Sequence, residues 1–134
     1  MAVTLTLTQK VEAAGGVSVS EYPVISTDEY AVLNVAVPHG TSDLEVAVGA
    51  ALADMKMLAI IASAYPETTG VKNLSVKFHD AGNDPVLLDN MLLISGAGAC
   101  AEMIPGECDS LFFSNDHAST DVTVTIIVAK DSTP

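Results

Sequence analysis

Apolar and polar residues alternate along much of the chain with a period of two, which is the pattern of a half-buried β-strand. At the start, Val3, Leu5 and Leu7 alternate with threonines. Residues 30–37 alternate in the same way. The Pro-His-Gly sequence that follows them predicts a turn, because proline cannot donate to a β-ladder and glycine tolerates turn geometry. Further strands are predicted over residues 44–48, 57–63, 71–79, 86–88, 91–95, 110–114 and 122–129.

The segments between these strands are predicted to be mostly loops. Residues 10–28 contain two consecutive glycines and a proline, so we expect a loop with one short extended piece over residues 17–22. Residues 96–107 are rich in glycine and alanine, and we expect a second long loop there. A short helix over residues 48–57 is a less favoured alternative, because the segment is brief, lacks a capping residue and lies between strands.

About eight to ten short strands separated by turns predict an all-β fold, either an antiparallel β-sandwich or a jelly-roll-like domain. The chain has 134 residues, which suits a single domain over residues 1–134 with an extended N-terminal strand or arm over residues 1–9. Strands do not alternate with long helices, and the sequence contains no glycine-rich nucleotide-binding motif. A parallel nucleotide-binding sheet is therefore not expected.

The charge of the chain limits its partners. Five lysine and arginine residues oppose seventeen aspartate and glutamate residues, so the formal net charge is −12. Such a charge repels both the phosphate backbone of nucleic acids and anionic lipid headgroups. The apolar runs are far shorter than the ~20 residues that cross a bilayer, and the first ten residues do not resemble a targeting segment. We therefore expect neither a nucleic-acid partner nor a membrane association.

The apolar residues are numerous but small. They make up 49% of the chain, whereas aromatic residues make up only 4% and tryptophan is absent. So much apolar surface on a strongly charged chain predicts that part of it meets another protein chain. The aromatic side chains, most of which we expect in the core, are Tyr22, Tyr30, Tyr65, Phe78, Phe112 and Phe113.

The polar segment between the last two predicted strands, residues 115–121 (NDHASTD), is the strongest candidate for chemistry. Its residue types occur in metal and hydrolase sites, but they also suit turns, so we favour a loose hairpin or a sandwich corner. The three histidines, His39, His79 and His117, each lie beside a turn with an acidic residue nearby. A three-histidine zinc site would need all three at one end of the sandwich, and exposed turn histidines are the favoured interpretation.

A turn over residues 80–85 carries several hard oxygen ligands. Turn formation is the favoured interpretation, because Asp, Asn, Gly and Pro dominate the segment. A surface calcium site is the alternative, although the spacing of an EF-hand is absent. The candidate calcium ligands are Asp80, Asn83, Asp84 and Asp89.

The two cysteines, Cys100 and Cys108, fit no common zinc or redox spacing. Free thiols are the favoured interpretation, and a loop-closing disulfide is the alternative. The sequence also lacks a nucleophile-elbow pattern. We therefore assign no catalytic, cofactor-binding or metal-binding residue, and we expect neither an enzyme nor a cofactor.

Two segments resemble a known family. The sequences YAVLNVAVPHGTSDLEVAVGA (residues 30–50) and SLFFSNDHASTDVTVTIIVAK (residues 110–130) are similar to the small β-sandwich capsid decoration proteins, or cement proteins, of tailed bacteriophages. In that family a late strand that ends in Ser-Asn, a polar turn and a valine-rich last strand recur.

The resemblance implies a non-enzymatic virion protein that is made in the host cytoplasm and binds the capsid exterior. There it would clamp neighbouring subunits of the major capsid protein at local three-fold positions, as a homotrimer. Its contacts would come from strand edges, loops and the N-terminal arm, which can add a strand to a neighbour. The candidate interface residues are Val3, Leu5, Leu7, His39, Asp116 and His117.

Two alternatives remain open from the sequence. The first is another phage virion component, in the tail or at the head-to-tail junction, which would have the same fold but few copies per particle. The second is a secreted β-sandwich module that binds glycans or calcium, which would be a monomer with an oxidised cysteine pair.

Overall fold

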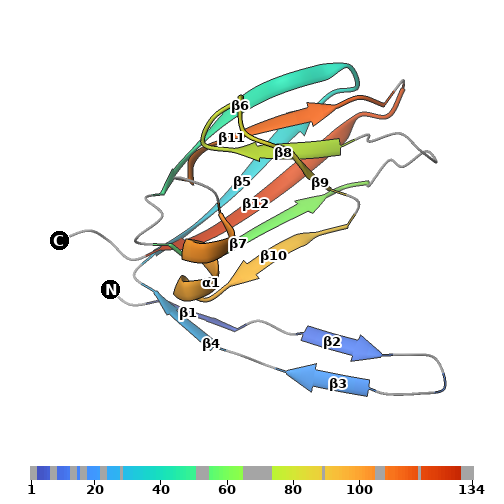
Figure 1. Cartoon of the computed structure of the whole chain (residues 1–134). Helices are drawn as coiled ribbons and strands as arrows, with labels where there is room; N and C mark the ends of the chain where they lie inside the picture. Colours follow the sequence, from blue (N-terminus) through green and yellow to red (C-terminus); the bar gives the residue numbers. More distant parts are fainter. Residues whose placement is uncertain are drawn as a thin grey trace.

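The computed structural model confirms an all-β, antiparallel, sandwich-like architecture (Figure 1). Two four-stranded sheets pack face to face, and a ribbon of four short strands precedes them in the chain. The structure describes residues 3–6, 9–12, 15, 18–21, 24–27, 29–50, 55–64, 74–88, 90–104, 108–117 and 119–130.

The first sheet has the strand order β10-β7-β12-β5, and the second sheet has the order β6-β11-β8-β9. All pairings within both sheets are antiparallel. The first sheet consists of β5 (Glu29–Val37), β7 (Met55–Ala62), β10 (Leu92–Ser95) and β12 (Val122–Lys130). The second consists of β6 (Thr41–Ala50), β8 (Leu74–Phe78), β9 (Val86–Leu87) and β11 (Cys108–Asn115).

The alternation of β12 determines how the first sheet packs. Val124, Ile126 and Val128 are buried in the core, so the residues between them point to the outer face. Strands β5 and β7 pair with β12 along most of its length, which keeps their alternation in step with it. The second sheet contributes alternate residues of β8 and β11. The main core side chains are Val37, Leu58, Ile60, Leu74, Val76, Phe78, Leu111, Phe113, Val124, Ile126 and Val128.

Two connections cross from one sheet to the other at the same end of the sandwich. Between β5 and β6, Gly40 has φ +78°, and the N–H of Thr41 donates to the carbonyl of Pro38 (3.2 Å), which confirms the predicted turn. Between β11 and β12, residues 116–121 form the second crossing. The N–H of Gly40 donates to the carbonyl of Asn115 (2.8 Å) and joins the two connections. The polar segment is therefore a sandwich corner. This is one of the two arrangements predicted for it, the other being a loose hairpin.

The prediction of a loop over residues 10–28 is wrong. In the structure β1 (Val3–Thr6) pairs with β4 (Val24–Thr27), and β2 (Gln9–Glu12) pairs with β3 (Ser18–Glu21). Both pairs keep the same register, so they form one hairpin, which we call the N-terminal ribbon. Gly15, with φ +72°, lies at its tip, so the glycines mark a hairpin turn. The predicted extended piece over residues 17–22 corresponds to β3.

The predicted loop over residues 96–107 is also wrong in its first half, because α1 (Ala97–Met103) forms there. Alanine favours helices, and this short helix is stabilised by packing against β7 and β10. Cys100 and Ile104 on its buried side belong to the core. Cys100 is a free thiol, which excludes the alternative of a disulfide to Cys108, and burial raises the pKa of the Cys100 thiol. The described parts of residues 48–57 are strand ends, not helix.

Two adjacent phenylalanines test the inward and outward assignment of β11. Phe113 is fully buried and Phe112 is only partly buried on the outer face. We expect Phe113→Ala to reduce the free energy of unfolding by about 3–5 kcal/mol, because it leaves a cavity in the core. Phe112→Ala, the matched control, should cost about 1 kcal/mol. Chemical denaturation followed by circular dichroism measures both, and equal losses would contradict the assignment.

Candidate functional site

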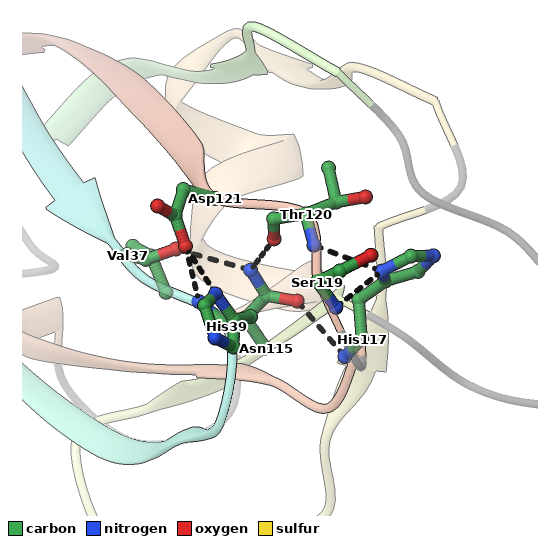
Figure 2. Close-up of polar contacts among 7 residues, drawn as sticks. All are labelled: Val37, His39, Asn115, His117, Ser119, Thr120 and Asp121. Atoms are coloured by element: carbon green, nitrogen blue, oxygen red, sulfur yellow. Dashed lines mark hydrogen bonds and ion pairs between the residues drawn. The ribbon is translucent and has the colours of Figure 1, made fainter.

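The two crossings meet in a cluster of polar residues at one end of the sandwich (Figure 2). Its centre is Asn115, the one buried polar residue in the part of the chain that the structure describes. The Asn115 Nδ2 atom donates to the carbonyl of Val37 (3.0 Å) and to the carbonyl of Thr120 (2.8 Å). Its Oδ1 atom accepts the backbone N–H of His117 (3.1 Å). One amide side chain therefore ties the end of β5 to both sides of the corner.

His117 stabilises the corner through its ring. Its Nδ1 atom accepts the backbone N–H groups of Ser119 (3.2 Å) and Thr120 (3.0 Å). A ring nitrogen that accepts these hydrogen bonds carries no proton and cannot offer the same lone pair to a metal ion. The side chain is thus part of the turn.

His39 ties the first crossing to the second. Its backbone N–H donates to Oδ1 of Asp121 (2.9 Å), and its Nδ1 atom lies 2.6 Å from the same oxygen. These hydrogen bonds hold the pKa of Asp121 below its usual value. The bond from the backbone N–H of His39 has the largest effect, and the bond from the ring has the next largest. Both side chains are largely exposed, at 49% for His39 and 69% for Asp121.

An aspartate that orients a histidine supplies two of the three members of a nucleophilic triad, and the third member would be a hydroxyl or thiol at the other ring nitrogen. Within the described residues, all the hydrogen bonds of His39 go to Asp121. What the cluster does is to hold the two crossings together through Asn115, His117 and the pair of His39 with Asp121.

The three histidines do not meet at one end of the sandwich. His39 and His117 both lie at the corner (Figure 2), whereas His79 follows β8 at the other end of β11. Its backbone N–H donates to the carbonyl of Ser110 (2.8 Å), five residues before Asn115 in β11. At ~3.3 Å per strand residue, the two positions are about 16 Å apart. The described residues contain no group of three His, Cys, Asp or Glu side chains that could hold a metal ion.

The candidate calcium ligands participate in a turn. Oδ1 of Asp80 accepts the backbone N–H of Gly82 (2.7 Å), and Nδ2 of Asn83 donates to the carbonyl of Phe78 (2.7 Å). Asp84 is exposed on the same turn, and Asp89 lies outside the described residues. The favoured interpretation of this segment, turn chemistry, is confirmed.

The candidate interface residues fall into two regions. Val3 and Leu5 lie in β1, where they pair with Thr27 and Ile25 of β4, and Leu7 lies outside the described residues. His39, Asp116 and His117 lie at the corner, where His39 and Asp116 are exposed and His117 is partly exposed. The structure thus brings the last three together and places the first two in the N-terminal ribbon. Contacts of these residues with another molecule stay a prediction.

The outer face of the second sheet is polar and charged. Glu45 of β6 and Lys77 of β8 lie on either side of Phe112 in one row across the sheet. Lys77 Nζ is 3.0 Å from Oδ1 of Asp43, in an ion pair that also lies on this face. Hydroxyl groups of Ser110 and Ser114 donate to the carboxylates of Glu45 (3.3 Å) and Asp43 (3.4 Å). Such a face is well suited to contact with solvent.

The outer face of the first sheet has the opposite character. One row across its strands, Val32, Ile127, Ala59 and Leu93, is apolar throughout. Tyr30 and Val32 are 52% and 50% exposed, so the expectation of a core position is wrong for Tyr30, which points outward from the edge strand. No charged residue occurs at the outward positions, which are Tyr30, Val32, Asn34, Ala36, Met57, Ala59, Ile61, Leu93, Ser95, Thr123, Thr125, Ile127 and Ala129. Met57, Ala59 and Ala129 are buried, so the exposed part of this face lies mainly at Tyr30, Val32 and Ile61.

Sequence reasoning missed two features of these surfaces. The uncharged face could have been found by following the outward positions of the strands predicted over residues 30–37, 57–63, 91–95 and 122–129, since none of these positions carries a charge. The role of Asn115 could not have been found in this way. Its partner Val37 is 78 residues away along the chain, and only the pairing of the strands brings the two residues together.

We expect Asn115→Ala to reduce the free energy of unfolding by about 2–3 kcal/mol, because it removes the Asn115 donor from the buried carbonyl of Val37 and from the partly buried carbonyl of Thr120. Asn34→Ala is the matched control. Its amide is exposed and accepts one hydrogen bond from Thr125 (2.8 Å), so the loss should be below about 0.5 kcal/mol. Urea unfolding measures both, and a loss for Asn115→Ala as small as that of the control would contradict the role of Asn115.

The lowered pKa of Asp121 predicts a pH dependence. The folded state stabilises the ionised carboxylate, so this stabilisation is fully present above the unfolded pKa near ~4 and is lost as the pH falls through the folded pKa. Asp121→Asn should therefore lower the melting temperature at neutral pH, and the difference should shrink below about pH 4. Asp116→Asn removes one charge from the same corner and is the control. A difference that stays constant from neutral to acidic pH would contradict the prediction.

The described residues include no helix long and apolar enough to cross a membrane. Comparison of the chain with protein-family models, curated proteins and solved structures gives no match.

Proposed function

We propose that the protein is a non-enzymatic structural subunit of a bacteriophage virion, which binds the outside of an assembled capsid and stabilises contacts between neighbouring major capsid subunits. The observation that carries this proposal is the N-terminal ribbon. Its outer strands β2 and β3 pair with each other and, among the described strands, with no other. A two-stranded hairpin alone is only marginally stable in water, so this segment suits a neighbouring protein surface.

The dimensions of the ribbon support an arm-like role. Its described pairs begin at Val3 and end at Glu12 in the same register, and at ~3.3 Å per residue this span is about 30 Å. Figure 1 shows β2 and β3 extending away from the two sheets. A ribbon of this kind has two edges with which it can extend the sheet of a partner protein. An arm that reaches one capsid subunit from a body that rests on another would clamp the two together.

The contrast between the two faces of the sandwich also supports the proposal. The first sheet carries exposed Tyr30, Val32 and Ile61 on an uncharged outer face, whereas the second carries Asp43, Glu45 and Lys77. An exposed apolar surface with a polar surface opposite is typical of a protein that has one side against a partner and one side in water. The net charge of −12 keeps free copies soluble and apart before they bind.

The two segments that resemble capsid decoration proteins are neighbours in the fold. Residues 30–50 include most of β5 and all of β6, and residues 110–130 include most of β11 and all of β12. Strand β5 pairs with β12, and β6 pairs with β11, so the segments form one continuous part of both sheets together with the corner. The resemblance therefore concerns one structural unit.

A shortened ribbon tests the proposal. Residues 9–21 are replaced by Asn-Gly, a two-residue sequence that favours a tight hairpin turn. Wild type and variant are then sedimented with emptied heads of the phage that encodes the chain. We expect the wild type to saturate the heads in a fixed ratio to the major capsid protein. The variant should bind at least about tenfold more weakly, because it lacks the arm.

The control for this variant is its own stability, because the two sheets should melt at nearly the wild-type temperature. Heads that bind no wild-type protein would overturn the proposal. Binding of only a few copies per particle, at one vertex or at the tail, would replace it with the tail or head-to-tail alternative.

A further inference from the structure

Strand β5 is the one edge of the sandwich that lacks protection against pairing with another strand. The described strands give each sheet two edges, formed by β5 and β10 in the first sheet and by β6 and β9 in the second. Natural proteins protect sheet edges by short strands, by charged residues and by irregular backbone. Strands β9 and β10 are short, with two and four residues.

Strand β6 is long but protected in two other ways. Asp43 and Glu45 give it charge, and Asp43 adopts a positive φ of 50°. Its register with β11 shifts between Phe113 and Asn115. These irregularities make β6 a poor template for another strand.

From Tyr30 to Val37, strand β5 has none of these features. It is nine residues long, pairs with β12 without a register shift, and has no charged residue and no proline from Tyr30 to Val37. A long, regular and apolar edge strand is a site where another strand adds to the sheet.

The side chains around β5 also lack full cover. Leu33 and Val35 point toward the core, but they are only partly buried. On the facing edge of the second sheet, Leu44 and Val46 of β6 are partly buried as well. The sandwich is therefore open on the side where β5 and β6 lie, and a neighbour at β5 would cover part of its core.

We propose that β5 binds a second copy of this chain, and that two β5 strands pair antiparallel about a two-fold axis near Leu33. Charge favours this partner. Two chains with a net charge of −12 can approach closely only where neither surface is charged, and β5 presents such a surface to an identical one. Two-fold contacts, in which the same patch serves both copies, are the commonest form of self-association.

The position of the axis follows from the one charge in the strand. Glu29 lies at the start of β5 and Leu33 at its middle. Antiparallel pairing centred on Leu33 places Glu29 of one copy opposite Val37 of the other, so the two Glu29 residues lie at opposite ends of the paired strands. The two first sheets then join into one sheet of eight strands, and their uncharged outer faces become continuous. This contact deepens the proposed function, because it assembles a wider surface for a capsid, but it does not require that the partner surface be a capsid.

Sedimentation velocity of the full chain, over a wide range of concentration, tests the contact with two lysine variants. Val32→Lys places a charge on the outward, half-exposed side of β5, and Ala47→Lys places the same charge on an exposed position of β6. We expect a dimer for the wild type and for Ala47→Lys. For Val32→Lys we expect a dimer weakened at least about tenfold, because lysine at an edge opposes strand pairing.

Circular dichroism and melting temperature show whether the variants are folded. If Val32→Lys does not fold, Tyr30→Lys, which changes a side chain of similar exposure on the same face, takes its place. A wild-type monomer at all concentrations, a wild-type trimer, or equal dimer affinity for the two lysine variants would each overturn the pairing of β5 with itself. None of these results depends on capsid binding. A dimer that does not bind heads would overturn only the proposed function.

Discussion

The pairing of β12 with β5 on one side and with β7 on the other determines which residues of the first sheet are buried. Its residues alternate between the core and the outer face of the first sheet, and both neighbours follow this alternation through the antiparallel register. A shift by one residue would exchange the two faces, moving Val124, Ile126 and Val128 out of the core. The packing of these three side chains against the second sheet therefore determines which residues of the first sheet lie on its outer face.

The corner and the open edge are two consequences of this register. Because Val122 pairs with Val37, the end of β5 lies beside the start of β12, and Asn115 can bridge the two crossings from β11. The same register leaves β5 at the edge of its sheet with Tyr30 and Val32 exposed. One end of the sandwich is thus closed by the hydrogen bonds of Asn115, while the side at β5 carries the proposed contact with a second copy. The N-terminal ribbon is separate from β5. In the proposed arrangement, β5 binds a second copy of the chain and the ribbon binds the surface of a different protein.

The sequence predicted the strands of the two sheets well, because several of them have one buried face that imposes a period of two, and β7 is a continuous apolar run that is buried along most of its length. The clearest examples are β8, with Leu74, Val76 and Phe78 buried, and β12. The ribbon was predicted only in part: an N-terminal strand over residues 1–9 and an extended piece over residues 17–22 were expected, but the glycines and the proline suggested a loop instead of a paired hairpin. Helix α1 was missed because alanine and glycine together suggested a loop, although Cys100 and Ile104 anchor the segment in the core.

The candidate site was predicted in outline but not in its contacts. Residues 115–121 form a corner, as expected, but the burial of Asn115 and the pairing of His39 with Asp121 depend on strand order, which a local pattern does not contain. The separation of His79 from the other two histidines likewise follows from the antiparallel pairing of β8 with β11. The alternation within a strand thus predicts whether a side chain points inward or outward. The residues that it contacts depend on which strands pair with one another.

Hydrogen exchange of the β5 amides, measured residue by residue on the wild-type chain at high and low protein concentration, shows whether a second copy covers this edge. In an edge strand, alternate N–H groups point away from the neighbouring strand, here β12. If a second copy covers the edge, these amides should exchange as slowly as those of β12 at high concentration and faster on dilution. If they exchange rapidly at every concentration while the intervening amides stay protected, the edge is free and the account of β5 as a contact surface is contradicted.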